Sequence, residues 1–133
     1  MAQARSLDGL RILIAEDNLF AAMELEQAVS SLGCQAVGPV ARVQQALELA
    51  QEQQLDGALL DVDLRGEMVF PVADELVKRG VPVVFASGYD NGPVFPDRFA
   101  DHPRLRKPYL ENEVKRMVQQ AFTHRPGSGG GSA

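Results

Sequence analysis

The sequence predicts an α/β domain built on a five-stranded parallel sheet with helices on both faces. Five short apolar runs alternate along the chain with stretches of helical periodicity. Most of these runs are continuously apolar, a pattern typical of strands that are covered on both faces. The chain has 133 residues, which is the size of one ordinary domain.

The first half of the chain is expected to contain three strands and two helices. Residues 11–15 form a compact β-rich run. The next apolar residues recur at spacings of 3, 4 and 3, on one face of a helix that ends at Gly33: Ala22, Leu25, Val29 and Leu32. Residues 35–38 predict a short strand closed by a Gly-Pro pair, and a second helix is marked by Val43, Leu47 and Ala50. Residues 57–61 predict a buried strand that ends on an aspartate.

The second half is expected to add two strands and two regular helices. A helix ended by Gly80 is marked by Val72, Ala73, Leu76 and Val77, and residues 81–86 form the clearest strand pattern. Residues 90–103 hold three prolines and a glycine, so we expect a short or irregular helix there, with one turn shared by Phe95 and Phe99. Residues 104–107 predict an edge strand, and the last helix is marked by Leu110, Val114, Met117 and Ala121.

The alternation of strands and helices also limits the topology. Right-handed crossovers between parallel strands leave few arrangements. We predict the flavodoxin-like, doubly wound sheet with strand order 2-1-3-4-5. Residues 9–124 are assigned to the domain and residues 1–8 to an N-terminal extension. Residues 125–133 are assigned to a flexible Gly/Ser-rich tail, of the kind that serves as a linker or is added in cloning.

Composition argues against nucleic acid and membranes as partners and indicates the cellular compartment. With 13 basic and 18 acidic residues the formal charge is −5, which argues against nucleic-acid binding over most of the surface. A short basic patch, Arg104, Arg106 and Lys107, is the exception. The single cysteine, Cys34, cannot form an internal disulfide and is expected to be a small buried residue in a reducing compartment. There is no apolar run of about 20 residues and no signal-peptide core, so we expect a cytoplasmic protein without membrane contact.

Polar side chains gather at the carboxyl ends of the expected strands. Glu16 and Asp17 follow the first strand, and Asp61, Ser87 and Lys107 end the third, fourth and fifth. Each alone is explained by helix-start or turn chemistry. Together they are better explained by a pocket, because ligands bind beyond the carboxyl ends of such a sheet at its switch point.

The chemistry of such a pocket follows from its side chains. Three neighbouring carboxylates repel one another, and Mg²⁺ with its preference for oxygen ligands relieves that repulsion. An aspartate can act as a nucleophile and form an acyl phosphate. Lys107 offers a positive charge to a phosphoryl oxygen, and Ser87 offers a hydroxyl to another.

These residues also carry a family resemblance. The runs ILIAED at 12–17, LLDVDL at 59–64, ASG at 86–88 and KPY at 107–109 resemble the response-regulator receiver family, over residues 9–124. The resemblance implies that Asp61 is the phosphoacceptor and that Mg²⁺ is held by Glu16, Asp17, Asp61 and the backbone carbonyl of Asp63. It further implies that Ser87 is the switch hydroxyl, that Lys107 contacts the phosphoryl group, and that the Lys107–Pro108 peptide is cis.

The sequence departs from the usual receiver pattern at the position of the aromatic switch residue, three before the lysine, where Arg104 stands. The run FASGY at 85–89 is similar to the Phe-Ala-Thr-Gly-Tyr signature of the "FAT GUY" receivers, a mostly single-domain group known from alphaproteobacteria. Ser87 replaces the threonine of that signature and keeps the hydroxyl. Tyr89 is a candidate switch residue, with a loop-packing aromatic as an equal alternative.

The expected function is that of a phosphorylated switch rather than an enzyme. A sensor histidine kinase or histidine phosphotransfer protein would donate a phosphoryl group to Asp61, and the change at Ser87 would reorder residues 90–103. Output would pass through protein contacts, or the domain would act as a phosphate sink. The main alternative is a Mg²⁺-dependent phosphatase or phosphotransferase with Asp63 as general acid. A flavodoxin-like cofactor binder is a third reading, disfavoured because no Ser/Thr/Gly-rich phosphate loop follows the first strand.

Overall fold

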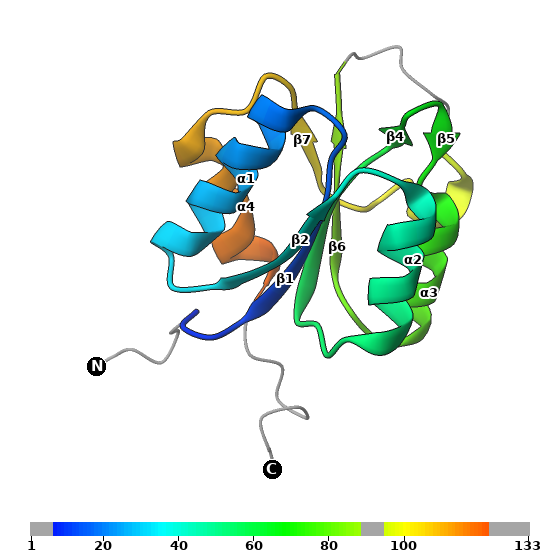
Figure 1. Cartoon of the computed structure of the whole chain (residues 1–133), viewed down its shortest axis with the longest axis horizontal. Helices are drawn as coiled ribbons and strands as arrows, with labels where there is room; N and C mark the ends of the chain where they lie inside the picture. The colour runs from blue at the N-terminus through cyan, green and yellow to red at the C-terminus, as the bar shows by residue number, and fades with distance from the viewer. Residues whose placement is uncertain (1–6, 89–94, 123–133) are drawn as a thin grey trace.

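The computed structural model describes residues 7–88 and 95–122 and confirms the predicted topology. Five parallel strands form one sheet with the order β2-β1-β3-β6-β7. This is the predicted order 2-1-3-4-5, because β4 and β5 form a separate hairpin and the fourth and fifth strands of the sheet are therefore β6 and β7. The strands of the sheet are β1 (Arg11–Ala15), β2 (Gln35–Val40), β3 (Gly57–Asp61), β6 (Val83–Ser87) and β7 (Arg104–Arg106). Helices flank both faces of the sheet (Figure 1), so the fold is the doubly wound one.

The four α-helices found in the described residues pack as two pairs. Helices α1 and α4 contact each other on one side of the sheet, and α2 and α3 contact each other on the other side (Figure 1). Their bounds are α1 (Leu19–Ser31), α2 (Val43–Glu52), α3 (Phe70–Lys78) and α4 (Glu111–Ala121). Helix α1 begins where the Asn18 side chain accepts a hydrogen bond from the Ala21 amide at 2.9 Å, as an N-cap residue does.

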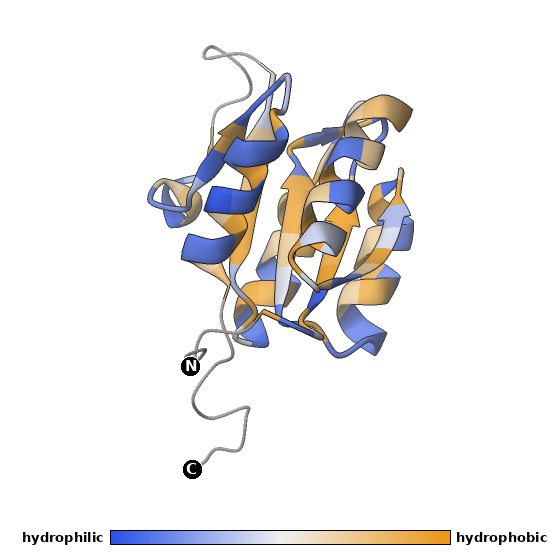
Figure 2. Ribbon diagram, turned by 90° about the vertical axis from the view of Figure 1, so that its left-hand side faces the viewer, coloured by the Kyte–Doolittle hydropathy of each residue, from blue (hydrophilic) through white to orange (hydrophobic). Residues whose placement is uncertain are grey.

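The sheet separates two apolar cores. In β1, Leu13 and Ala15 pack toward α2 and α3, whereas Ile12 and Ile14 pack toward α1 and α4. Burial of both faces explains why the strand is apolar at successive positions. Figure 2 shows this distribution, with hydrophobic strands in the centre and hydrophilic residues on the outer sides of the helices. Cys34 is buried as predicted, and burial raises the pKa of its thiol to about 11.

Several predicted boundaries were wrong. Strand β6 ends at Ser87 rather than at residue 86, and β7 ends at Arg106 rather than at residue 107. Strand β2 continues past the Gly-Pro pair to Val40, because Gly38 adopts φ +97° and lets the strand resume after a bulge in its pairing with β1. Strand β6 begins after Pro82, whose carbonyl still accepts a hydrogen bond from Ala58. Leu110 is the extended residue before α4 rather than part of that helix.

Two predicted core positions are exposed instead. Val77 is 46% exposed on α3, and Leu110 is 60% exposed. Helical spacing alone cannot tell which edge of an apolar stripe reaches the core, and Val77 lies at such an edge, next to the buried Leu76.

The segment between β6 and β7 matches the prediction of a short fourth helix. In its described part, residues 95–103, the helical portion is the 3-10 turn η1 (Asp97–Phe99). Phe95 does not share this turn, since it precedes Pro96 and a residue before proline is disfavoured in the helical region. Phe95 and Phe99 nevertheless meet in one aromatic cluster with Phe70 and Phe85, at ring-centroid distances of 5.1–5.9 Å.

A two-stranded hairpin follows β3, in a stretch for which the sequence analysis predicted no strand. It consists of β4 (Asp63–Leu64) and β5 (Glu67–Met68). Arg65 and Gly66 form its turn with φ of 53° and 90°, the positive values that a tight two-residue hairpin requires.

No helix in the described parts of the chain is long and apolar enough to cross a bilayer.

Candidate functional site

Three carboxylates meet at the carboxyl ends of β1 and β3, as the topology predicted. Glu16, Asp17 and Asp61 each place one oxygen within 4.8 Å of the other two. Glu16 is 3% exposed and Asp61 is 5% exposed, so their charges are largely removed from water. Buried charges of one sign are tolerated only with a compensating partner, and the cluster therefore needs cations.

Lys107 supplies one of these positive charges. Its Nζ lies 2.9 Å from Asp61 Oδ2 and 3.0 Å from Glu16 Oε2, so a single ammonium group bridges both buried acids. The Lys107 amide donates to the Ser87 carbonyl at 3.0 Å, which joins the ends of β6 and β7 beside the cluster. The Lys107–Pro108 peptide is cis, as the family resemblance implied.

One ammonium group does not balance three carboxylates. Burial raises the pKa of Asp61 to about 7; the hydrogen bond from Lys107 opposes this rise and the charge of Glu16 adds to it. Burial by itself would lower the pKa of Lys107, but its bonds to Asp61 and Glu16 outweigh burial and raise that pKa. The remaining negative charge and the oxygen-only donor set suit a hard divalent cation such as Mg²⁺.

Glu16 is held by residues to which the sequence analysis gave no role. The Tyr109 hydroxyl donates to Glu16 Oε1 at 2.7 Å, and the Asn18 amide donates to Glu16 Oε2 at 3.1 Å. Burial and the neighbouring Glu16 charge raise the pKa of Tyr109 far above its ordinary value, so the hydroxyl stays a donor. The only hint of this contact in the sequence was the presence of a tyrosine two positions after Lys107.

Asp17 is anchored from the β4–β5 hairpin. The Arg65 amide, at the hairpin turn, donates to Asp17 Oδ2 at 2.8 Å. The Asp63 amide donates to Asp61 Oδ1 at 3.3 Å, whereas the Asp63 side chain accepts from the Gly66 amide at 2.7 Å and stabilises the turn. The role predicted for the Asp63 carbonyl as a metal ligand stays a prediction.

Two of the predicted switch positions lie in the described residues. Ser87 ends β6 and is partly buried, next to Lys107 through the strand pairing. Arg104 is the first residue of β7, and its guanidinium Cζ lies 3.7 Å from the centre of the Phe95 ring. Arg104 is exposed, as Arg106 is, and its guanidinium also joins the aromatic cluster through the contact with Phe95. Tyr89 lies outside the described residues.

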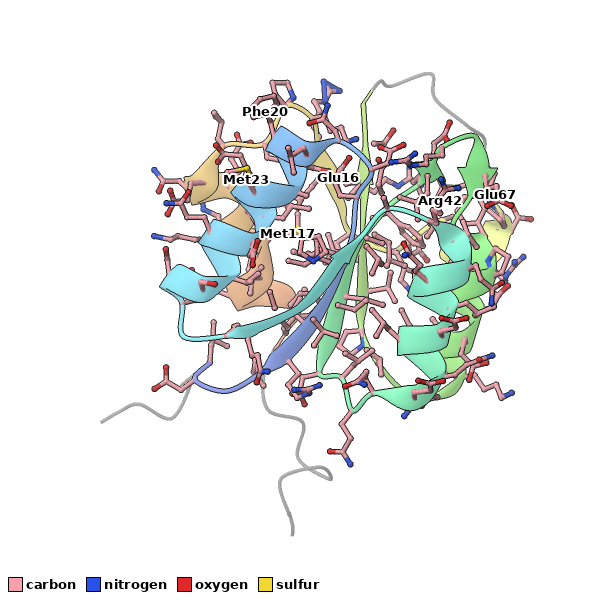
Figure 3. All side chains as sticks on the ribbon, viewed as in Figure 1. Glu16, Phe20, Met23, Arg42, Glu67 and Met117 are labelled. Carbon is pink, nitrogen blue, oxygen red and sulfur yellow. The ribbon has the colours of Figure 1, made fainter. Side chains whose placement is uncertain are left out.

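A cavity of about 630 Å³ opens beside the cluster. Its lining includes Lys107 and Tyr109 beside the cluster and Phe20 of α1. Leu19, Phe20 and Met23 on α1 are 54–77% exposed, and Leu110 is 60% exposed at the start of α4. Figure 3 shows Phe20 and Met23 directed outward from α1, with Glu16 inside at the end of β1. We call Leu19, Phe20 and Met23 the α1 apolar patch.

Comparisons with known proteins find similar chains. SdrG from Sphingomonas melonis Fr1 is 40% identical, and the match covers 83% of this chain and 93% of that one with a TM-score of 0.74. The receiver domain of sensor histidine kinase PA1611 from Pseudomonas aeruginosa, described with a magnesium ion in its active-site cleft, is 27% identical over 85% and 97% of the two chains, with a TM-score of 0.71.

Curated relatives are longer. The phyllosphere-induced regulator PhyR of Methylorubrum extorquens is 31% identical over 120 residues, which is 84% of this chain and 43% of the regulator. The chain spans less than half the length of the curated relatives it matches. No family model matches the sequence.

Proposed function

The chain belongs to the response-regulator receiver family, and we propose that it is a phosphorylated switch in which Asp61 accepts a phosphoryl group in a Mg²⁺-dependent reaction. One observation carries the proposal. Asp61 ends β3 as a buried carboxylate, bridged by Lys107 and adjoined by two further acids within 4.8 Å. That arrangement combines a nucleophile, a positive charge and an oxygen donor set in one place.

The proposed transfer has a phosphohistidine as donor. A carboxylate oxygen of Asp61 attacks the phosphorus; the new P–O bond forms as the P–N bond breaks, and the bonding electron pair leaves with the imidazole. Lys107, already 2.9 Å from Asp61, would follow the transferred phosphoryl oxygens with its ammonium group. Mg²⁺ held by Glu16, Asp17, Asp61 and the Asp63 carbonyl would supply further neutralisation of the phosphoryl charge.

The surface around the site supports a protein as donor. Phe20, one residue of the exposed α1 apolar patch, lines the same cavity as Lys107. Exposed apolar side chains that cluster beside a reactive group are typical of a protein-binding surface. We therefore propose a sensor histidine kinase or a histidine phosphotransfer protein, which would cover Phe20 and Met23 while its histidine reaches Asp61.

Output is proposed to pass from Ser87 to the aromatic cluster. A phosphoryl group on Asp61 would attract the Ser87 hydroxyl, at the end of the strand that also carries Phe85. The rings of Phe85 and Phe95 form a T-shaped pair with centroids 5.1 Å apart, and Arg104 covers Phe95 from β7. A shift in β6 would thus change the packing of residues 95–104, with Tyr89 as a further candidate from the sequence. Output through protein contacts and action as a phosphate sink are both consistent with this route.

Phosphorylation with a small phosphodonor tests the proposal. Incubation of the protein with Mg²⁺ and acetyl phosphate should add one phosphoryl group per chain by intact mass, and Asp61→Asn should abolish the addition. Asp63→Asn is the matched control and should keep the labelling. Turnover of a small phosphomonoester that depends on Asp63 would instead support the phosphatase alternative, which the bond between Asp63 and the Gly66 amide disfavours.

A further inference from the structure

Tyr109 links the apolar core to the acidic cluster. Its side chain packs in the core between the sheet and helices α1 and α4 and is 7% exposed. Its hydroxyl emerges from that core 2.7 Å from Glu16 Oε1. The ring is fixed by packing, so the hydroxyl is a donor with a fixed position.

The two oxygens of Glu16 have different partners. Oε2 accepts from the Asn18 amide at 3.1 Å and from Lys107 Nζ at 3.0 Å. Within residues 7–88 and 95–122, the hydrogen bond that reaches Oε1 comes from Tyr109. Bonds to Oε2 alone leave the carboxylate free to turn, because the terminal torsion of glutamate is broad. A second donor on Oε1 fixes the plane of the group.

We propose that Tyr109 is a positioning residue for the divalent cation, holding the Glu16 carboxylate in the orientation in which it faces Asp17 and Asp61. This inference rests on the proposed function, since it concerns the same metal site. A carboxylate has about four lone-pair directions, so one hydrogen bond to Oε1 does not use up its capacity to bind a cation. Donors behind metal-binding carboxylates orient them in this way, and their loss typically weakens metal binding about 10- to 100-fold.

The length of the glutamate side chain makes the contact specific. An aspartate at position 16 would be shorter by one carbon–carbon bond, about 1.5 Å. Added to the present 2.7 Å, that retreat takes the carboxylate out of hydrogen-bond reach of Tyr109. The effect of the tyrosine hydroxyl should therefore depend on Glu16, which a double-mutant cycle can detect.

Calorimetric titration of the unphosphorylated full chain with Mg²⁺ tests the positioning role of Tyr109. Tyr109→Phe keeps the ring and should raise the Kd for Mg²⁺ by about 10- to 100-fold. In a Glu16→Asp background the same substitution should change the Kd by less than about twofold. Ser31→Ala is the control: it removes another hydroxyl that contacts a carboxylate, Glu111 at 3.4 Å, at the opposite end of α1, and should leave the Kd unchanged.

The outcomes separate the inference from the proposed function. An unchanged Kd in Tyr109→Phe, or an equal loss with and without Glu16, overturns the positioning role while the receiver function stands. Absence of Mg²⁺ binding by the unsubstituted chain overturns the metal dependence and the positioning role together. A second measurement, by NMR on the unsubstituted chain, does not depend on the Tyr109→Phe variant. The carbon resonance next to the Tyr109 hydroxyl should shift on Mg²⁺ titration with the same midpoint as the Asp17 amide, and a resonance that stays constant contradicts the inference.

Discussion

Replacing Asp61 by asparagine should stabilise the metal-free protein at alkaline pH. Burial raises the pKa of Asp61 from 3.8 to about 7 in the folded chain, whereas the unfolded chain keeps the ordinary value. The folded state therefore binds a proton more tightly across this interval, and the free energy of unfolding falls as pH rises from about 4 to about 7. Asparagine resembles the protonated carboxyl and carries no charge, so the variant should escape that fall.

The size of the effect follows from the two pKa values. Each pH unit between them corresponds to about 1.4 kcal/mol, which gives an upper bound of about 4 kcal/mol above pH 7. Lys107 keeps its 3.0 Å contact with Glu16 in the variant, so the cluster does not leave a buried ammonium without a partner. We expect a stabilisation of about 1–4 kcal/mol at pH 8 that declines to near zero at pH 4.

Urea denaturation at several pH values between 4 and 8, in the presence of a chelator, measures this difference. Asp101→Asn, which changes an exposed aspartate in the turn before β7, is the control and should leave the stability profile unchanged. A variant Asp61→Asn that is less stable than the parent at pH 8, or a difference that does not vary with pH, would refute the reasoning. It would show that the bond to Lys107 outweighs burial and the repulsion from Glu16.

Three other substitutions test the proposed switch. Lys107→Met leaves buried carboxylates without their ammonium partner and should cost roughly 2–3 kcal/mol in urea denaturation at pH 8; an unchanged stability contradicts the bridging role. Phe20→Ser should slow phosphotransfer from the cognate kinase about tenfold or more without changing labelling by acetyl phosphate, and Val77→Ser, an exposed apolar residue on α3, is its control. Equal rates with the kinase would place the docking surface elsewhere. Arg104→Ala should lower the free energy of unfolding by about 1 kcal/mol through loss of the contact with Phe95, and Arg104→Lys by less. An alanine variant of unchanged stability would mean that the contact contributes nothing.

The features that could be predicted from the sequence are those that follow from its recurring apolar patterns. Strands buried on both faces show continuous apolar runs, and crossover handedness leaves few strand orders. The flavodoxin-like order chosen among them is the one observed. The same logic brought Glu16, Asp17 and Asp61 together, because the ends of neighbouring parallel strands share one edge of the sheet.

Features that depend on single contacts could not be predicted in this way. The β4–β5 hairpin has strands of two residues each, too short to show a period, and its turn places non-glycine Arg65 at positive φ. The bond from Tyr109 to Glu16 joins residues 93 positions apart, and the stacking of Arg104 on Phe95 depends on where an irregular segment returns to the sheet. Such contacts are set by the packed structure and leave no periodic trace in the sequence.

The charge balance of the site connects its structure to its proposed role. With three carboxylates and one ammonium group, Asp61 has its pKa raised to about 7 and is only partly ionised near neutral pH. A protonated carboxyl is a poor nucleophile, so only the ionised fraction of the metal-free site would accept a phosphoryl group at that pH. A cation beside Asp61 favours the ionised form and would thereby produce the reactive carboxylate. The residues that orient the neighbouring acids, the Tyr109 hydroxyl on Glu16 and the Arg65 amide on Asp17, would then set the cation concentration at which the switch becomes competent. The affinity of the site for the cation and the rate of phosphorylation of Asp61 would therefore change together, because both depend on the same charges.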